Sequence, residues 1–526
     1  MRRSLSLLAL TLSLCGALPS QAAAPAATPQ VAWLSAAGDA DIERAFAQAK
    51  GEGKPVLVYW GASWCPPCNQ LKATLFNRQD FIERSRSFVA VAIDGDLPGA
   101  QKLGARFKVR GYPTMILFTP DGHEITRLPG EADAPQVLAL LQAGLAGGRL
   151  VKAVLADAKA GRTLRAGEWR MLAFYSWDTD EQQLVPAHDR PALLATLAAA
   201  CPANEREAAT RLWLKTLAAS DEGQGVKPDA ALRERVLKVL KDPVASRQQM
   251  DVLTNSPAEI TRVLAAKGSP ERTPLLAAFD ASLKRLQRDT TMSRADRMTA
   301  LLGRVELARL DLPEDAKAPK LDAALAKELR DEAARADREI RDGYERQAVI
   351  TTAAQLLERG GFVAESDALL KANLSKSHSP YYLMSQLAGN ARRRGDSDSA
   401  LSWYAQAWDK SVGPATRLQW GASYLGALVD LAPKDAARIE QTAARIFDEA
   451  GQAQGSFYER SARSLQRVSA KLQSWNADGA HAASVQRLQA RLDAVCGKLD
   501  TADAQRATCQ GFSDTLRKPA AKKSAS

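Results

Sequence analysis

The chain has 526 residues, of which 46% are hydrophobic and 25% charged, and this balance is typical of a soluble globular protein with several domains. The net charge is +11, yet the basic residues are spread along the chain. A nucleic-acid-binding protein usually gathers them into a stripe or a recognisable motif, so the composition argues against nucleic acid as a partner.

The first 24 residues have the pattern of a signal peptide. Arg2 and Arg3 precede a short apolar run at 5–14, and small residues at 20–24 offer a cleavage site. The run is too short to span a bilayer comfortably, and no later stretch resembles a transmembrane helix. We therefore expect a signal peptide at 1–24 and a periplasmic mature protein, in a compartment where disulfides form.

Strand and helix patterns then alternate from residue 31 to residue 147. In chain order, the expected elements are a helix at 42–53, a buried strand at 55–60, a helix after Cys65, a buried strand at 88–94, a weak helix at 98–109, a hairpin of 114–118 with 124–128, and a helix at 134–146. Alternation of this kind predicts a small α/β domain.

Two cysteines lie where the first buried strand meets its helix. Pro66 suits the first helical position, which puts Cys65 at the helix N-terminus, where backbone donors and the helix dipole favour a thiolate. Such a thiolate can attack a disulfide, and Cys68, one turn later, can resolve the mixed disulfide. A purely structural disulfide is the alternative. A zinc site would need two more ligands at suitable spacing, so neither a metal nor a cofactor is expected.

Two motifs connect this region with a known family. WCPPC at 64–68 matches a W-C-x-x-C motif, and RGYPT at 110–114 matches a cis-proline loop. Residues 31–147 therefore resemble a thioredoxin-fold domain. Among relatives, they are most similar to bacterial exported thioredoxin-like proteins, including the C-terminal domain of the membrane thiol–disulfide interchange protein.

The resemblance implies an activity and a set of site residues. It implies a thiol–disulfide oxidoreductase that uses Cys65 and Cys68, with Pro113 cis beside them. It further implies that Trp64 forms part of the rim of the site and that the backbone at Tyr112 pairs with an extended substrate segment. From its helix position, Cys65 is expected to be the exposed nucleophile and Cys68 the buried resolving thiol.

One position departs from the family. The buried aspartate that usually stands six residues before the first cysteine is replaced by Tyr59, and the accompanying lysine is missing from 88–94. Cys68 would therefore need another proton acceptor.

The residues between the cysteines bear on the direction of electron flow. Pro66 and Pro67 lack the N–H groups that could otherwise hydrogen-bond a Cys65 thiolate. Strong oxidants have an unusually stabilised thiolate and potentials near about −120 mV, whereas the reductant thioredoxin lies near about −270 mV. We therefore expect a disulfide reductase that acts on a protein disulfide or dithiol client and draws electrons from a membrane donor of the thiol–disulfide interchange type.

From 150 to 515 the composition favours helices throughout. Two stretches, at 357–374 and 391–408, each lead from an Arg-Gly turn into a helix, and their alanines Ala368 and Ala400 are 32 residues apart, near the tetratricopeptide period. A large all-α, repeat-like region is expected, with tetratricopeptide-like hairpins around 345–450.

Glycines at 144, 147 and 148 mark the expected joint between the two regions, which predicts that they are separable. The basic tail at 516–526 is expected to be disordered.

The remaining cysteines are assigned by spacing. In one continuous helix Cys496 and Cys509 would lie about 20 Å apart, too far to bond. Gly497 and Asp500 indicate a helix end and a helix start, so a hairpin could join the two cysteines in a structural disulfide. Cys201 is expected to be a buried or idle thiol.

Aromatic residues gather in the second half of the chain, and they either fill helix-pair cores or line a concave groove that binds a partner. They are Tyr381, Tyr382, Trp403, Tyr404, Trp408, Trp420, Tyr424 and Trp475. Two functions remain open: an oxidoreductase whose helical region engages a client, or a protein-binding scaffold or chaperone-like module with a secondary redox site.

Overall fold

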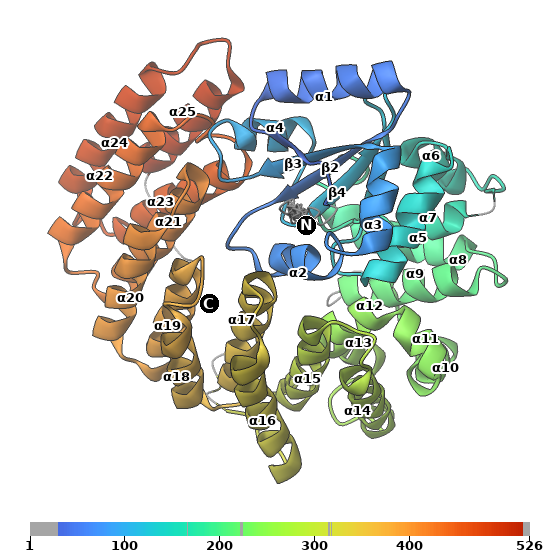
Figure 1. The fold of residues 1–526 in the computed structure, drawn as a ribbon. Helices are drawn as coiled ribbons and strands as arrows, with labels where there is room; N and C mark the ends of the chain where they lie inside the picture. The colour runs from blue at the N-terminus through green and yellow to red at the C-terminus, as the bar shows by residue number, and fades with distance from the viewer. Residues whose placement is uncertain (1–29, 166, 221–224, 314–315, 317, 519–526) are drawn as a thin grey trace, which may run out of the picture.

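A computed structural model describes residues 30–165, 167–220, 225–313, 316 and 318–518. The expected signal peptide lies outside the described residues. An α/β domain occupies the centre of the molecule, and helices α6 to α25, here called the helical arc, curve around it (Figure 1).

The α/β domain contains one mixed sheet with the strand order β1-β3-β2-β4-β5. The first three strands in this order are parallel, and β4 and β5 are antiparallel to their neighbours. The strands are β1 Leu34–Ala36, β2 Val56–Gly61, β3 Val89–Asp94, β4 Thr114–Phe118 and β5 Glu124–Leu128. The helices are α1 Asp39–Glu52, α2 Pro66–Thr74, α3 Gln79–Arg84, α4 Ala100–Arg106 and α5 Ala134–Leu145. The sequence patterns did not predict β1 and α3, which are both short.

Alternate side chains of β2 enter two separate apolar layers. Val58 and Trp60 pack with residues of α1 and α4. Leu57 and Tyr59 pack with residues of α2 and α5 on the opposite face. Because helices cover both faces, the central strand has to be apolar throughout, which explains its unbroken hydrophobic run.

The helical arc contains no named strand within the described residues. Its helices are α6 Val151–Lys159, α7 Glu168–Phe174, α8 Arg190–Ala200, α9 Arg206–Ala219, α10 Ala230–Lys241, α11 Pro243–Gln248, α12 Met250–Asn255, α13 Pro257–Leu264, α14 Arg272–Arg288, α15 Arg294–Arg309, α16 Ala323–Glu339, α17 Gly343–Arg359, α18 Val363–Asn373, α19 Pro380–Arg394, α20 Ser397–Lys410, α21 Pro414–Leu431, α22 Ala436–Gln452, α23 Glu459–Trp475, α24 Ala482–Gly497 and α25 Ala504–Arg517. Helix α25 takes in the first two residues of the expected disordered tail, and residues 519–526 lie outside the description.

Consecutive helices from α17 to α22 pack on one another. Gly361 (φ 90°) and Gly395 (φ 79°) turn the chain into α18 and α20, and the left-handed backbone at both positions favours glycine. Helix α17 packs on α2 and α23 packs on α4, so the arc contacts the α/β domain at two places far from its start.

Apolar packing continues across the expected joint between the two regions. One apolar cluster of buried residues runs from Val31 through the glycine-rich segment at 144–148 to Leu212. The first helices of the arc therefore complete the core of the α/β domain.

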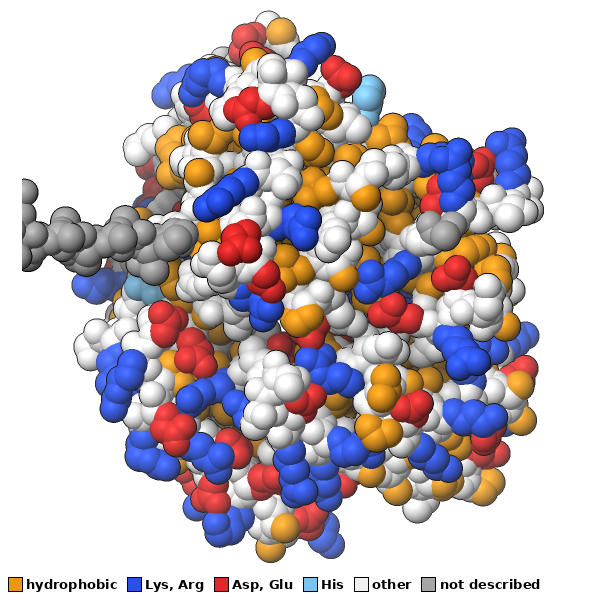
Figure 2. Space-filling view, turned by 45° about the vertical axis from the view of Figure 1, so that its right-hand side comes forward, with side chains coloured by type: hydrophobic (Ala, Val, Ile, Leu, Met, Phe, Trp, Pro, Cys, Tyr) orange, Lys and Arg blue, Asp and Glu red, His pale blue; other side chains and the backbone are white. Residues whose placement is uncertain are grey.

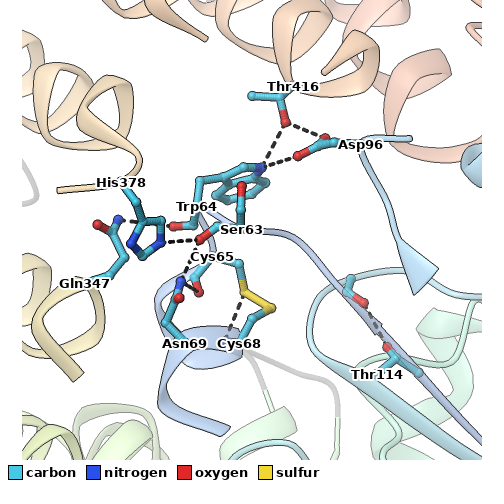
Figure 3. Close-up of a disulfide and its surroundings, with 11 residues drawn as sticks. Ser63, Trp64, Cys65, Cys68, Asn69, Asp96, Thr114, Gln347, His378 and Thr416 are labelled. Carbon is cyan, nitrogen blue, oxygen red and sulfur yellow. Dashed lines mark hydrogen bonds between the residues drawn. A yellow bond between two sulfur atoms is a disulfide. The ribbon is translucent and has the colours of Figure 1, made fainter. Parts of the chain in front are cut away.

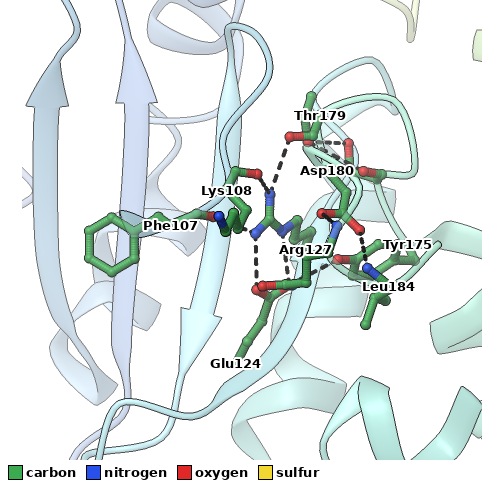
Figure 4. Close-up of polar contacts among 10 residues, drawn as sticks. Phe107, Lys108, Glu124, Arg127, Tyr175, Thr179, Asp180 and Leu184 are labelled. Carbon is green, nitrogen blue, oxygen red and sulfur yellow. Dashed lines mark hydrogen bonds and ion pairs between the residues drawn. The ribbon is translucent and has the colours of Figure 1, made fainter. Parts of the chain in front are cut away.

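Arg127 of β5 ties this part of the arc to the sheet (Figure 4). Its side chain is fully buried and forms an ion pair with Glu124 at 2.9 Å. The guanidinium also donates hydrogen bonds to the carbonyls of Phe107 at 2.6 Å, Lys108 at 2.7 Å and Thr179 at 3.2 Å. Because Thr179 belongs to the segment after α7, one guanidinium joins β5, the loop before β4 and the helical arc.

Lys and Arg side chains are interspersed with Asp and Glu side chains over the face shown in Figure 2. The excess of basic residues therefore does not form a single-sign patch on this face.

We predict that Arg127→Leu lowers the free energy of unfolding by about 3–5 kcal/mol, because it leaves the carbonyl of Phe107 without this donor and the part-buried Glu124 without its cation. Urea unfolding of the full chain measures this loss. The control is Arg78→Leu, which removes a half-exposed arginine paired with Asp80 and should change stability by no more than about 0.5 kcal/mol. Equal effects of the two substitutions would contradict the role assigned to Arg127.

Candidate functional site

Cys65 and Cys68 form a disulfide at the start of α2, with their Cα atoms 5.2 Å apart (Figure 3). Cys65 is the N-cap residue, and its Sγ accepts a hydrogen bond from the backbone N–H of Cys68 at 3.2 Å. Pro66 and Pro67 occupy the first two helical positions and have no N–H to offer. The N–H of Cys68 is thus the donor that the first turn supplies to this sulfur.

The loop before β4 lines the same cavity as Cys65, through Gly111 and Tyr112. The Tyr112–Pro113 peptide bond is cis. A Cβ atom at Gly130 would lie 2.7 Å from Cγ of Pro113, so a larger residue there would displace the proline ring. Gly130 is a site residue that sequence reasoning missed, although the Pro-Gly pair at 129–130 was a visible turn signal.

Both sulfurs are buried. Cys65 is 3% exposed and Cys68 is fully buried. The expectation that Cys65 is exposed is therefore wrong for this oxidised form, because the arc covers the site. The sequence motifs of the α/β domain could not predict this burial, because the residues that cover Cys65 lie 280 to 400 positions further along the chain.

The side chain of Trp64 is held between the α/β domain and the arc. Its indole N–H is shared between Asp96 at 2.9 Å and the hydroxyl of Thr416 at 2.8 Å. Asp96 also pairs with Arg460 of α23 and accepts a hydrogen bond from Thr416 of α21. We call Trp64, Asp96, Thr416 and Arg460 the clasp, because the four side chains join β2–α2, β3–α4 and two helices of the arc.

Aromatic rings of the arc cover the indole of Trp64. Tyr382 stacks on it with the ring centroids 5.9 Å apart, and Trp420 meets it edge-on at 6.3 Å. The guanidinium of Arg460 lies 5.1 Å from the ring centres of both Trp64 and Tyr112. Of the aromatic residues that gather late in the sequence, Tyr382 and Trp420 thus reach the site, whereas Tyr381, Trp408 and Trp475 are buried in a helical core.

The backbone of the active-site loop is also held by the arc. The ring Nε2–H of His378 donates to the carbonyl of Ser63 at 3.0 Å, and the amide of Gln347 donates to the carbonyl of Trp64 at 3.4 Å. Within α2, the buried Asn69 donates to the carbonyls of Ser63 and Cys65 at 2.7 and 2.8 Å. Side chains from α17 and from the loop between α18 and α19 therefore fix the loop that carries the cysteines.

A cavity of about 280 Å³ lies beside Cys65. Pro66, Pro67, Gly111 and Tyr112 line it on the side of the α/β domain, and on the side of the arc it is lined by Tyr382, Glu459, Arg460 and Arg463. Three of the residues that the sequence indicated for the redox site, Trp64, Cys65 and Tyr112, line this cavity. Cys68 and Pro113 do not line it.

Tyr59 fills the position of the family's buried acid. Its ring packs against Trp33 and Phe76, and its hydroxyl has no hydrogen-bond partner among the described residues. Burial raises the pKa of Tyr59 well above its usual value. The position therefore supplies no carboxylate to Cys68.

The other cysteines lie away from this site. Cys496 and Cys509 form a disulfide between α24 and α25, with Cα atoms 5.5 Å apart. Cys201 is a buried free thiol, and burial raises its pKa to about 11. No three His, Cys, Asp or Glu side chains in the described part of the chain are grouped as a metal site would require.

These features define a thioredoxin-like domain with a CxxC pair at a helix N-terminus and a cis-proline before β4. Residues 42–145 match the family model of the thioredoxin-like domain. The fold is thus a thioredoxin-like fold followed by many helices.

Two curated relatives carry the name thiol:disulfide interchange protein DsbD. DsbD 2 of Pseudomonas aeruginosa is 32% identical over 131 residues, which are 24% of this chain and 22% of that protein. The Pseudomonas fluorescens protein is 31% identical over 111 residues, which are 20% of this chain and 19% of that protein. The chain thus spans about a fifth of the length of these relatives.

Among solved structures, oxidised thioredoxin O1 from Arabidopsis thaliana matches with 19% identity and a TM-score of 0.18, covering 21% of this chain and 96% of the other.

Helix α2 has a second polar contact with the arc. The side-chain amide of Gln70 donates to Asp296 at 2.7 Å and to Ser293 at 3.2 Å, at the start of α15. Burial raises the pKa of the Asp296 carboxyl from 3.8 to about 6.

We predict that this carboxyl makes the folded state less stable as the pH rises. Between about pH 3.8 and 6 the folded chain keeps the proton of Asp296 while the unfolded chain loses it, so the free energy of unfolding falls across this interval. Asp296→Asn should remove this part of the slope in urea-unfolding curves measured from pH 4 to 7. Asp331→Asn, at an exposed carboxyl, should leave the slope in this interval unchanged. An unchanged slope in Asp296→Asn would contradict the assignment.

Proposed function

We propose that this protein is a thiol–disulfide oxidoreductase in which Cys65 is the nucleophile and Cys68 the resolving thiol. The observation that carries the proposal is the position of Cys65 at the N-cap of α2, with its sulfur accepting the N–H of Cys68 and a cis-proline in the adjoining loop. The names of the DsbD relatives support the same chemistry.

In the reducing direction, the Cys65 thiolate attacks one sulfur of a substrate disulfide. The substrate's S–S bond breaks, a mixed disulfide forms, and the other substrate sulfur leaves as a thiolate that takes up a proton. Cys68 then loses its proton and attacks the sulfur of Cys65. The Cys65–Cys68 disulfide forms, the second substrate thiol is released, and two electrons have passed from the protein to the substrate.

Three further residues frame the reacting sulfurs in this proposal. Pro113 shapes the loop beside them, and the backbone of Tyr112 pairs with an extended substrate segment. Trp64 forms the wall of the site cavity between the domain and the arc. Because its indole is held by the clasp, Trp64 acts as a fixed wall rather than a mobile rim.

We further propose that the protein works as a reductase. The first turn of α2 offers the Cys65 sulfur one backbone N–H, since residues 66 and 67 are prolines. A less stabilised thiolate lowers the tendency of the disulfide to take up electrons and favours the reducing end of the scale.

The sequence and the names of the relatives support a proposal for the cellular setting. We propose a periplasmic protein with a signal peptide at 1–24, a protein disulfide or dithiol client, and a membrane electron donor of the thiol–disulfide interchange type. No helix within the described residues is long and apolar enough to cross a membrane.

The second candidate is a protein-binding scaffold with a secondary redox site. The hairpins of the arc and the cavities along its inner side favour it. The two candidates differ in one respect: a scaffold keeps its cellular phenotype when both Cys65 and Cys68 are replaced.

We predict that Cys65→Ser abolishes reduction of a model disulfide, because it removes the attacking sulfur. Cys68→Ala should still attack once and then accumulate mixed disulfides, which nonreducing gels and mass spectrometry would reveal. The matched control, Cys496→Ser with Cys509→Ser, removes the disulfide in α24–α25 and should retain the activity at a temperature where the variant is folded. Activity in Cys65→Ser would refute the proposed nucleophile.

We predict a reduction potential closer to about −270 mV than to about −120 mV for the Cys65–Cys68 pair. Equilibration of the protein in a series of glutathione ratios, followed by quantification of the disulfide, measures it. The pair Pro66→Gly and Pro67→His restores two N–H groups and adds a cation, so it should shift the potential toward the oxidising end. A wild-type value near that of the strong oxidants would show that the protein donates disulfides.

A further inference from the structure

Two larger cavities adjoin the site cavity along the inner side of the arc. One, of about 700 Å³, shares Pro66 and Pro67 with the site cavity and extends along α13, α15 and α17. The other, of about 650 Å³, shares Trp64 and Tyr382 with the site cavity and extends along α17, α19 and α21. Glu306, Gln355 and Arg359 line both larger cavities, so the three spaces border one another around the CxxC loop.

The dimensions exclude a folded substrate from the sulfurs. Cys65 is 3% exposed, and the space beside it is about 280 Å³. A folded domain of only 50 residues has a radius of gyration of about 10 Å. Such a domain cannot bring a surface disulfide to Cys65 while the arc stays in place.

The walls of the larger cavities suit a polypeptide backbone. Along α17 and α19, side chains that can hydrogen-bond, such as Gln355, Ser385 and Gln386, face the 650 Å³ cavity. The charged groups are largely paired with one another: Arg359 binds Glu306 through two contacts of 2.6 Å, and Arg393 binds Glu358 at 2.6 Å. The cavity therefore offers hydrogen bonds and aromatic faces rather than a net charge, and this suits segments of varied sequence.

We propose that the substrate is an extended, unfolded polypeptide segment that enters through these cavities and presents its cysteine at the CxxC loop. This inference rests on the proposed oxidoreductase function and restricts it to one substrate class. A small thiol would need only the site cavity, whereas the two larger cavities extend from the CxxC loop along the helices of the arc. The arc thus acts as a selector for chains that have lost or not yet reached their fold.

Gly389 provides a way to block the path. It lies on α19 and lines the 650 Å³ cavity, and a Cβ built there has no heavy atom within 4 Å. Gly389→Trp therefore places a large side chain in the cavity without a clash at its first carbon, and tryptophan is a better helix former than glycine. Gly511 of α25 is the matched control, because it is helical, also has open space at its Cβ and lines none of the three cavities.

The experiment follows single turnovers of the reduced full-length protein, freed of other reductants. Three substrates carry the same mixed disulfide to a chromophoric aromatic thiol: a blocked single cysteine, a flexible peptide of about 15 residues that spans up to about 50 Å when extended, and a folded domain with one surface cysteine. We expect the peptide to react at least about tenfold faster than the folded domain, and Gly389→Trp to lower the ratio of peptide rate to single-cysteine rate at least about tenfold. Gly511→Trp should keep the wild-type ratio.

The outcomes distinguish a failure of the oxidoreductase function from a failure of the proposed substrate class. If none of the three substrates is reduced, the proposed oxidoreductase function itself fails. If the folded domain reacts as fast as the peptide, the protein is a reductase but the selection of unfolded segments is refuted. The comparison of the three substrates on the wild-type protein decides this even where Gly389→Trp does not fold.

Discussion

Closure of the helical arc on the redox site depends on the carboxylate of Asp96. A buried carboxylate is costly unless several donors satisfy it, and here the donors come from Trp64, Thr416 and Arg460. The start of α21 lies close to Asp96. A Cβ atom built at Gly413 would be 2.6 Å from the Cβ atom of Asp96, and the backbone φ angle at Gly413 is 88°. A larger residue at 413 would push α21 away from the site and separate the donors from the carboxylate.

The sequence was informative wherever structure follows from neighbouring residues. The buried strands, the glycine turns at 361 and 395, and the N-cap position of Cys65 are local, and patterns over about ten residues predict them. Helical hairpins were also predictable, because their periodicity and their stops are local. The pairing of α17 with α2 was not, because nothing in either helix alone indicates which surface will cover it.

The same distinction explains which site residues were missed. Cys65, Cys68, Pro113, Trp64 and Tyr112 lie in two short motifs, so one sequence suffices to find them. Asp96, Thr416, Arg460 and His378 act through contacts with residues up to 364 positions away, and as isolated residues they resemble ordinary polar side chains of helices and loops. The expectation of an exposed Cys65 was wrong for this reason: it treated the thioredoxin-like domain as if nothing were built over it.

The two candidate functions are less distinct in the structure than in the sequence. A scaffold unrelated to the redox pair would have no need to hold the active-site loop, yet Gln347 and His378 donate to the carbonyls of the two residues before Cys65. Polar contacts to main-chain carbonyls fix geometry rather than add much net stability, since each replaces a hydrogen bond to water. The inner helices of the arc thus belong to the redox site as much as the thioredoxin-like domain does, and whatever binds along them lies next to Cys65.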